Sequence, residues 1–288
     1  MPATDGPSAA AAGELILGGD LTVRRLGFGA MRITGPGIWG EPPDRDGALA
    51  VLRRAVELGV NLIDTADSYG PDVSEELIAE ALHPYPEDLV IATKGGLTRS
   101  GPGRWEADCR PDRLKRCCED SLRRLRLDRI DLYQLHTVDP KVPYAESVGA
   151  LAQLRDEGKV RHVGISNVGT RNLDEARRIV PVVSVQNRYN ATARDSERVL
   201  EACEREGLGF LPWFPLGAGR LEAGPIDEIA RASGASPRQV ALAWLLKHSR
   251  VTLPIPGTSS VAHVEENVAA ASLRLSDDDY ERLAKLGE

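Results

Sequence analysis

The stretch V-N-L-I-D-T-A-D-S-Y-G, residues 60–70, decides how the rest of the chain is interpreted. Its apolar residues predict a short buried strand that ends at Asp64. A carboxylate at the end of an apolar strand costs free energy unless it meets a cation or hydrogen-bond donors. Tyr69 follows in a polar turn, so both side chains are expected at the mouth of the same sheet. Taken alone, the stretch fits a strand-capping Asp and an ordinary loop Tyr equally well.

The same pattern of an apolar strand followed by an amphipathic helix recurs along the chain. Eight strands are expected, at Leu26–Gly29, Val60–Asp64, Leu89–Thr93, Ile130–Leu135, Val160–Ile165, Val182–Val185, Leu208–Leu211 and Thr252–Ile255. Helices are expected at Asp46–Leu58, Val73–Leu82, Pro111–Arg126, Tyr144–Glu157, Thr170–Ile179, Asp195–Glu206, Pro237–Lys247, Val261–Ala271 and Asp277–Leu286. A hairpin is expected at Leu15–Val23, and Gly95–Arg110 is expected to be a long loop.

This alternation predicts an α/β fold. Parallel strands need crossover helices, and eight such units close into a barrel. A doubly wound open sheet is the alternative, but it would need G-x-G-x-x-G after the first strand, where this chain has only Gly27-Phe28-Gly29. We therefore predict a (β/α)8 TIM barrel with an N-terminal β-hairpin and an extra C-terminal helix. Residues 14–288 are expected to form this single domain, after a disordered tail over residues 1–13.

Composition narrows the functional classes. Of the 288 residues, 42% are hydrophobic and 27% are charged, as in an ordinary globular protein. The net charge of -7 argues against nucleic-acid binding, and no apolar run approaches the roughly 20 residues that span a membrane. The four cysteines form no C-x-x-C pair, which favours reduced thiols in a cytoplasmic protein. The five histidines show no metal-binding spacing, so no metal site is expected.

Polar side chains follow nearly every predicted strand. In a barrel, the carboxyl ends of the strands meet in one bowl, which is where active sites lie. The residues expected there are Asp64, Tyr69, Lys94, His136, Asn167, Gln186, Trp213 and Thr258. A single Lys or His at a strand end is usually structural. Four titratable groups that converge on one bowl are harder to explain as stabilising residues, and they indicate catalysis.

At these strand ends the sequence resembles the aldo-keto reductase family, over nearly all of residues 21–288. The motifs that carry the resemblance are I-D-T-A-D-S-Y-G (63–70), A-T-K-G-G (92–96), D-L-Y-Q-L-H (131–136), G-I-S-N (164–167), V-Q-N-R-Y-N (185–190) and P-I-P-G-T-S-S-V-A-H-V-E-E-N (254–267). The resemblance implies a reductase that uses NAD(P)H to convert aldehydes and ketones to alcohols. It also implies that the cofactor binds in the barrel mouth without a Rossmann fold.

The family's catalytic tetrad corresponds to Asp64, Tyr69, Lys94 and His136. Reducing a carbonyl builds negative charge on its oxygen, so a proton donor must lie beside that atom. The resemblance makes Tyr69 this donor, and a neighbouring Lys94 would favour its phenolate. Asp64 would neutralise and orient the lysine, while His136 would hydrogen-bond the carbonyl oxygen.

The family's cofactor contacts fall on the remaining strand ends. The matching positions are Ser166, Asn167, Gln186, Trp213, Phe214, Leu216, Gly217, Gly219, Arg220, Gly257, Thr258, Ser259, His263, Glu266 and Asn267. The chain departs from the family pattern at His263, where an Arg usually clamps the 2′-phosphate, and no Lys precedes the Ser/Thr run. Histidine grips a phosphate more weakly than arginine and in a pH-dependent way. NADP(H) is the preferred cofactor and NAD(H) the alternative.

The substrate pocket is the least defined part of the prediction. Met31, Trp39 and Trp105 lie in loops that would rim the bowl. The segments 35–45 and 69–75 resemble those of bacterial aldo-keto reductases that act on pyridoxal, which makes pyridoxal a candidate substrate. The protein is expected to be a monomer or weak homo-oligomer whose partner is a small carbonyl compound. The alternative function is a cofactor-binding regulatory or redox-sensor subunit with little turnover.

Overall fold

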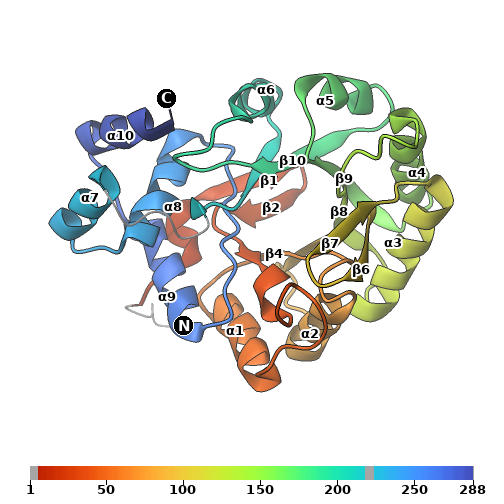
Figure 1. The fold of residues 1–288 in the computed structure, drawn as a ribbon, viewed down its shortest axis with the longest axis horizontal. Coiled ribbons are helices and arrows are strands. Elements are labelled where there is room, and N and C mark those ends of the chain that lie inside the picture. The colour runs from red at the N-terminus through yellow and green to blue at the C-terminus, as the bar shows by residue number, and fades with distance from the viewer. Residues whose placement is uncertain (1–5, 218–223, 288) are drawn as a thin grey trace.

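Seven parallel strands form a curled sheet at the centre of the computed structural model, which describes residues 6–217 and 224–287 (Figure 1). In spatial order they are β3 (Phe28–Gly29), β4 (Leu62–Asp64), β5 (Val90–Gly95), β8 (Ile130–Leu135), β9 (Val160–Ser166), β10 (Val182–Arg188) and β11 (Gly209–Trp213). All neighbouring pairs are parallel. The predicted strand positions are thus confirmed, with shifts of a few residues at their ends.

The segment 251–256 takes the eighth place and closes the barrel. On one side, the backbone N–H of Leu253 donates to the carbonyl of Phe210 at 2.8 Å. On the other side, the N–H of Gly27 donates to the carbonyl of Pro254 at 2.9 Å. Two residues of the segment are prolines, which have no N–H to donate, so it forms an isolated bridge instead of a regular strand.

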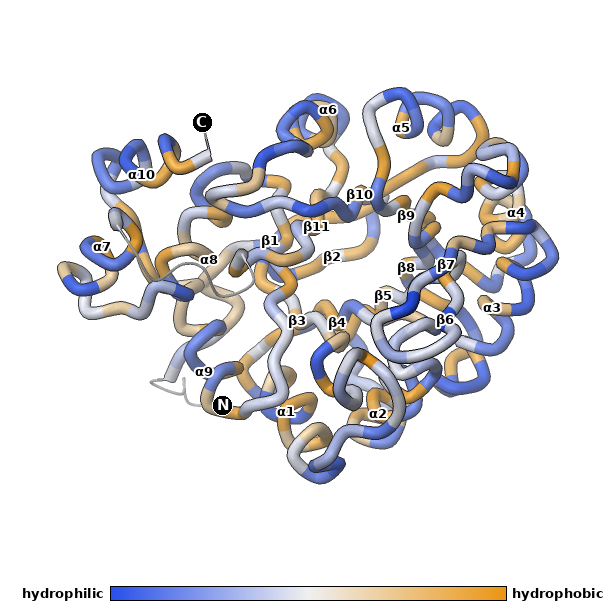
Figure 2. The backbone as a smooth tube through the Cα atoms, viewed as in Figure 1, coloured by the Kyte–Doolittle hydropathy of each residue, from blue (hydrophilic) through white to orange (hydrophobic). Residues whose placement is uncertain are grey.

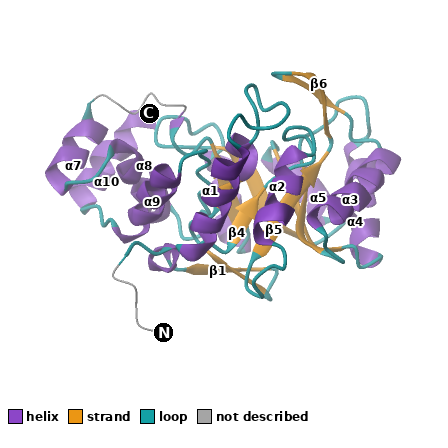
Figure 3. Ribbon diagram, turned by 90° about the horizontal axis from the view of Figure 1, so that it is seen from below, coloured by secondary structure: helices purple, strands orange, loops and turns teal. Residues whose placement is uncertain are grey.

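Helices surround the sheet. They are α1 (Arg45–Glu57), α2 (Val73–Leu82), α3 (Pro111–Leu125), α4 (Tyr144–Asp156), α5 (Thr170–Arg177), α6 (Glu197–Glu206), α7 (Pro225–Ser233), α8 (Pro237–His248), α9 (Val261–Ala269) and α10 (Asp277–Ala284). Short 3-10 helices lie at Ala9–Ala12, Ala30–Ile33, Ala270–Ser272 and Lys285–Gly287. The last four α-helices gather on one side of the barrel (Figures 1 and 3). No described helix has both the length and the hydropathy to span a membrane.

Apolar side chains fill both the barrel and the layer between sheet and helices. The strands of the central sheet are predominantly hydrophobic, whereas the surrounding helices contain many hydrophilic residues (Figure 2). The predicted hairpin is present as β1 (Glu14–Leu17) and β2 (Leu21–Arg24). Leu17 and Val23 of this hairpin pack against apolar residues of the strands, including Leu62 at the start of β4. The hairpin therefore plugs the end of the barrel that lies opposite the strands' carboxyl ends.

Two segments differ from the sequence-based expectation. Residues 8–13, expected to be part of a disordered tail, include the 3-10 helix Ala9–Ala12, which the Ser8 side chain caps. Ala9 is fully buried and its N–H donates to the carbonyl of Leu58, because a small side chain can approach the barrel closely. The expected loop 95–110 contains an antiparallel hairpin of β6 (Leu97–Gly101) and β7 (Arg104–Ala107).

Candidate active site

The barrel brings the four predicted catalytic residues together. Asp64 is the last residue of β4, Lys94 lies near the end of β5, and His136 directly follows β8. Tyr69 lies in the turn that leads from β4 into α2. All four side chains are buried at the carboxyl end of the sheet. They converge because parallel neighbours end at the same edge.

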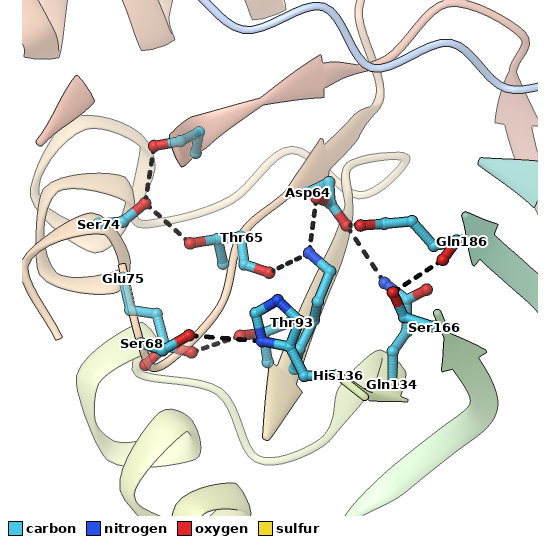
Figure 4. A network of polar contacts seen from close by, with 12 residues as sticks. Asp64, Thr65, Ser68, Ser74, Glu75, Thr93, Gln134, His136, Ser166 and Gln186 are labelled. Carbon is cyan, nitrogen blue, oxygen red and sulfur yellow. Dashed lines mark hydrogen bonds and ion pairs between the residues drawn. The ribbon is translucent and has the colours of Figure 1, made fainter. Parts of the chain in front are cut away.

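Asp64 is the centre of a buried polar network (Figure 4). Lys94 Nζ donates to Asp64 Oδ2 at 2.7 Å and to the carbonyl of Thr65 at 2.8 Å. The other carboxylate oxygen, Oδ1, accepts hydrogen bonds from Gln186 Nε2 at 2.8 Å and Gln134 Nε2 at 3.2 Å. A buried ion pair is tolerable when its remaining lone pairs and protons are satisfied, and this one is well supplied.

The lysine remains charged and the tyrosine remains protonated in this environment. Burial acts to lower the pKa of Lys94, but the carboxylate of Asp64 and the hydroxyl group of Tyr69 together outweigh it and hold the pKa above its usual value. Burial raises the pKa of Tyr69, while the ammonium of Lys94, 5.2 Å from the ring centre, opposes that rise. The phenol therefore keeps its proton at neutral pH and has a cation beside it that stabilises the phenolate.

His136 is a neutral hydrogen-bonding group. Burial and the charge of Lys94 together lower the pKa of His136 well below its usual range. Its ring centre lies 5.8 Å from that of Tyr69 and 6.5 Å from that of Trp105, in edge-to-face arrangements. Ser68 Oγ lies 3.4 Å from His136 Nδ1. A neutral imidazole carries one N–H donor, so this cluster can polarise a carbonyl without adding net charge.

A cavity of about 720 Å³ opens over this cluster. Of the predicted substrate-pocket residues, Met31 and Trp105 line it, together with Ile38 and Leu97, which the sequence reasoning missed. Trp39 is not among the lining residues. Instead, the guanidinium of Arg99 lies 3.7 Å from the ring centre of Trp105 and 5.7 Å from that of Trp39. Arg99 therefore joins the two tryptophans and fixes the rim.

The residues predicted to hold the nicotinamide of the cofactor are connected to one another by hydrogen bonds. Trp213 Nε1 donates to Asn167 Oδ1 at 3.0 Å, and Asn167 Nδ2 donates to the carbonyl of His136 at 2.9 Å. Ser166 Oγ donates to the carbonyl of Gln186 at 2.8 Å. These bonds hold the groups in place at the cavity wall, and they place the predicted cofactor residues next to the predicted catalytic residues.

Eleven of the predicted cofactor residues line the cavity: Ser166, Asn167, Gln186, Trp213, Phe214, Leu216, Gly257, Thr258, His263, Glu266 and Asn267. Gly217 and Ser259 do not line it, and Gly219 and Arg220 lie outside the described residues. Asn267 is 4% exposed, and its Oδ1 has no hydrogen-bond partner among the described residues. A buried acceptor without a donor suits a ligand with N–H groups, such as adenine. The lining therefore fits a dinucleotide.

The backbone is strained at three points of the cavity wall. Ile38, Asn167 and Phe214 have φ angles of 58°, 57° and 55°, in the left-handed region that few residues other than glycine adopt. Asparagine tolerates this conformation, whereas isoleucine and phenylalanine do so at a cost. Such strain is concentrated at binding sites, where the fold holds a side chain in a set direction.

Three further polar residues at the site were missed in the sequence. Gln134 occupies the position two residues before His136 on the same face of β8, a signal that its period-two spacing contained. Arg32 and Arg238 both line the cavity, but they come from the 3-10 helix after β3 and from the start of α8. No strand end marks either arginine.

Comparison with known proteins gives a consistent result. The model of the aldo/keto reductase family matches residues 25–288. An uncharacterized oxidoreductase of Schizosaccharomyces pombe is 50% identical over 272 residues, which cover 94% of this chain and 89% of that protein. Pyridoxine 4-dehydrogenase of Escherichia coli is 44% identical over 267 residues, which cover 90% and 93%.

A comparison of three-dimensional structures finds proteins of the same family. The crystal structure of an aldo-keto reductase from Klebsiella pneumoniae in complex with NADPH superposes with a TM-score of 0.82 and 28% identity. The match covers 95% of this chain and 94% of that one. Because the family model matches nearly the whole chain and two relatives are 50% and 44% identical to it, the chain belongs to the aldo/keto reductase family.

Proposed function

We propose that this protein is an NADPH-dependent carbonyl reductase that reduces an aldehyde to a primary alcohol. The observation that carries the proposal is the cluster of Tyr69, Lys94 and neutral His136 at one end of the cavity. The cluster offers a proton donor, a cation to stabilise the donor's conjugate base, and a second hydrogen-bond donor. Those are the three groups that a developing alkoxide needs.

The residues divide the chemistry between them. NADPH, when bound, supplies the hydride that reaches the carbonyl carbon. Tyr69 and His136 donate hydrogen bonds to the carbonyl oxygen, and the Tyr69 proton moves to that oxygen as negative charge develops on it. Lys94 stabilises the phenolate that remains, and Asp64 keeps Lys94 protonated. In the reverse direction the phenolate takes the proton of the alcohol.

Two groups of cavity residues would hold the two ends of NADPH, the nicotinamide and the adenine. Asn167 and Trp213 lie beside the catalytic cluster and would hold the nicotinamide. Glu266 and Asn267 of α9 would hold the adenine, for which the unpartnered Asn267 Oδ1 is a suitable acceptor. The related structure from Klebsiella pneumoniae, which contains NADPH, supports the choice of NADPH over NADH.

We propose pyridoxal as the substrate. The relative from Escherichia coli is a pyridoxine 4-dehydrogenase, and the reverse of its named reaction reduces an aldehyde on a pyridine ring. Here the substrate end of the cavity is bounded by the aromatic rings of Trp105 and Tyr69, whose centres lie 6.3 Å apart. The apolar side chains of Met31 and Leu97 complete the wall. A flat heteroaromatic ring can pack edge-to-face against such walls.

The test is a comparison of substrates and of one catalytic variant. NADPH oxidation is followed by absorbance with pyridoxal, methylglyoxal and an activated aromatic aldehyde, and pyridoxal should give the highest kcat/KM. Tyr69→Phe should lower kcat by about 10²–10⁴-fold, the usual contribution of a positioned acid. Its NADPH affinity, measured by fluorescence titration, should stay unchanged. Full activity in Tyr69→Phe would reject the mechanism, and tight NADPH binding without turnover of any aldehyde would favour a sensor.

We further propose that the protein works in the cytoplasm as a monomer or weak homo-oligomer. All four cysteines are free and buried, which suits a reducing compartment. The large apolar side chains that are exposed among the described residues, Ile16, Ile179 and Phe214, lie on three separate segments: β1, the turn after α5 and the loop after β11. Analytical ultracentrifugation over a range of concentrations tests the oligomeric state.

A further inference from the structure

The adenosine end of the cavity is poor in positive charge. Residues 257–267 contain no Lys or Arg, and His263 and two glutamates are their only ionisable side chains. NADPH carries a pyrophosphate and a 2′-phosphate, and protein sites for such anions normally provide charge-assisted hydrogen bonds. The cations for these phosphates must therefore come from other elements of the fold.

Position 257 cannot supply a cation. A Cβ on Gly257 would lie 2.4 Å from the carbonyl oxygen of Gly29, closer than real Cβ contacts occur. The same Cβ would lie 3.7 Å from Cγ of Arg32, whose side chain extends over this glycine from the 3-10 helix Ala30–Ile33. Arg32 is exposed, lines the cavity and forms no ion pair or side-chain hydrogen bond with any described residue. It is available to an anion.

A second arginine, Arg238, also lines the cavity. Arg238 is the second residue of α8, and its Nη1 lies 3.6 Å from Glu266 Oε2 on α9. Its neighbour Gln239 donates from Nε2 to the carbonyl of Glu266 at 3.0 Å and caps α8 together with Ser236. These bonds fasten the start of α8 to α9, which lie side by side (Figure 1). Arg238 is thereby held beside the residues proposed to bind adenosine.

We propose that Arg32 and Arg238 together form a split clamp for the cofactor phosphates, with Arg238 at the 2′-phosphate and Arg32 at the pyrophosphate. This inference rests on the proposed use of NADPH. The assignment follows the neighbours of each arginine: Arg238 lies beside Glu266, which is proposed to hold the adenine, whereas Arg32 lies beside Gly257, which directly follows the barrel segment 251–256. Guanidinium groups stay charged at all physiological pH values and can bond a phosphate with two parallel N–H donors.

The weak contact between Arg238 and Glu266 holds the guanidinium near the cavity before the cofactor binds. At 3.6 Å and with the arginine side chain 45% exposed, the pair is a weak surface ion pair that contributes little stability. A phosphate dianion can therefore displace the carboxylate at small cost. Until then, Glu266 keeps the guanidinium near the cavity, so less side-chain entropy is lost when the cofactor binds.

Binding measurements separate the two arginines. Dissociation constants for NADPH and for NADH are measured by quenching of tryptophan fluorescence, since Trp213 lines the cavity. Arg238→Gln should weaken NADPH binding about tenfold or more and leave NADH binding nearly unchanged, because only NADPH has the 2′-phosphate. Arg32→Gln should weaken both cofactors by a similar factor, because both have the pyrophosphate.

The controls distinguish this inference from the proposed function. Arg129→Gln removes an exposed arginine at the opposite end of the barrel and should change neither affinity. Thermal unfolding of each variant confirms that it is folded. If the wild-type protein binds neither cofactor, the proposed function fails. If it binds NADPH, and Arg238→Gln keeps the full preference for NADPH over NADH, the split clamp is wrong while the reductase stands. Unchanged binding in Arg32→Gln would likewise reject the role of Arg32.

Discussion

Asp67 is a buried carboxyl group close to the predicted catalytic residues, and its burial is expected to make the stability of the barrel depend on pH. It lies between Asp64 and Tyr69 in the sequence, is almost fully buried, and has one carboxylate oxygen without a hydrogen-bond partner among the described residues. Burial and the neighbouring charge of Glu75 raise its pKa to about 7. In the unfolded chain the same carboxyl has its ordinary pKa, so the folded state holds the proton more tightly.

The sign of the resulting pH dependence follows from proton binding. Between about pH 4 and pH 7 the folded state keeps a proton on Asp67 that the unfolded chain has already released. The free energy of unfolding therefore falls as the pH rises through this window. Each pKa unit corresponds to about 1.4 kcal/mol, so the full effect is on the order of 4 kcal/mol.

Asp67→Asn should remove this dependence. The variant should be more stable than the wild type at pH 8 by roughly 2–4 kcal/mol and nearly equal to it at pH 4, because the amide is neutral at both. Urea unfolding at the two pH values measures the difference. Glu87→Gln, at an exposed carboxylate, serves as the control and should shift neither midpoint. An equal gain at both pH values would show that the effect is not due to titration.

Some residues of the predicted site can be located from the sequence, and others cannot. Asp64, Lys94 and His136 were located because each follows an apolar strand, and a barrel gathers the ends of its strands. Arg32 and Arg238 could not be located in this way. Their relevance comes from contacts with Gly257 and Glu266, residues more than 20 positions away in sequence that only the closed fold brings near.

Among the elements, α2 and α3 are joined by a buried ion pair. Glu75 of α2 is fully buried, and its Oε2 accepts from Arg124 Nε of α3 at 2.7 Å. Its Oε1 accepts from Thr93 Oγ1 of β5. One carboxylate thus links two helices to a central strand. Breaking a buried pair from one side leaves the other charge uncompensated, which costs far more than the pair itself contributes.

Arg124→Met should therefore destabilise the protein by about 3–5 kcal/mol. Adding Glu75→Gln should recover most of the loss, since the stranded charge is then gone. Chemical denaturation of the wild type, both single variants and the double variant completes the cycle. Arg45→Gln, which removes exposed ion pairs with Glu41 and Glu80, is the matched control and should cost less than about 1 kcal/mol. If the double variant were as unstable as the sum of the singles, the pair would not be the cause.

Element prediction from the sequence worked where one face of a segment is buried. The predicted helix Val73–Leu82 matches α2 because its apolar residues repeat with helical spacing. The hairpin of β6 and β7 was missed because it lacks a buried apolar face. Its two strands pair through their backbones, and Arg99 Nη1 attaches the hairpin to the neighbouring loop by donating to the carbonyl of Ile38. Helix α7 was missed as well, although its buried residues Ile226, Ile229 and Ala230 repeat with helical spacing.

At the scale of the whole molecule, the barrel closes where the segment 251–256 contacts the residues around β3. Sequence counting predicted eight strands, but it could not show that two glycines make this closure possible. The backbone of the segment passes so close to β3 that a Cβ on Gly29 would lie 2.6 Å from the carbonyl oxygen of Ile255. The contact is between backbones, so no side-chain rotation can relieve it. The adjoining Gly257 is restricted in the same way.

Gly29→Ala should therefore destabilise the barrel, although its φ of -92° is one that alanine adopts freely. Overpacking of this kind costs about 1–3 kcal/mol. Gly149→Ala is the matched control, because Gly149 lies within α4 with no atom within 4 Å of a Cβ. There alanine should stabilise by about 0.5–1 kcal/mol, since glycine is a poor helix former. Urea midpoints that move in opposite directions would show that closure limits stability, whereas a neutral Gly29→Ala would mean that the barrel can open at this seam without loss.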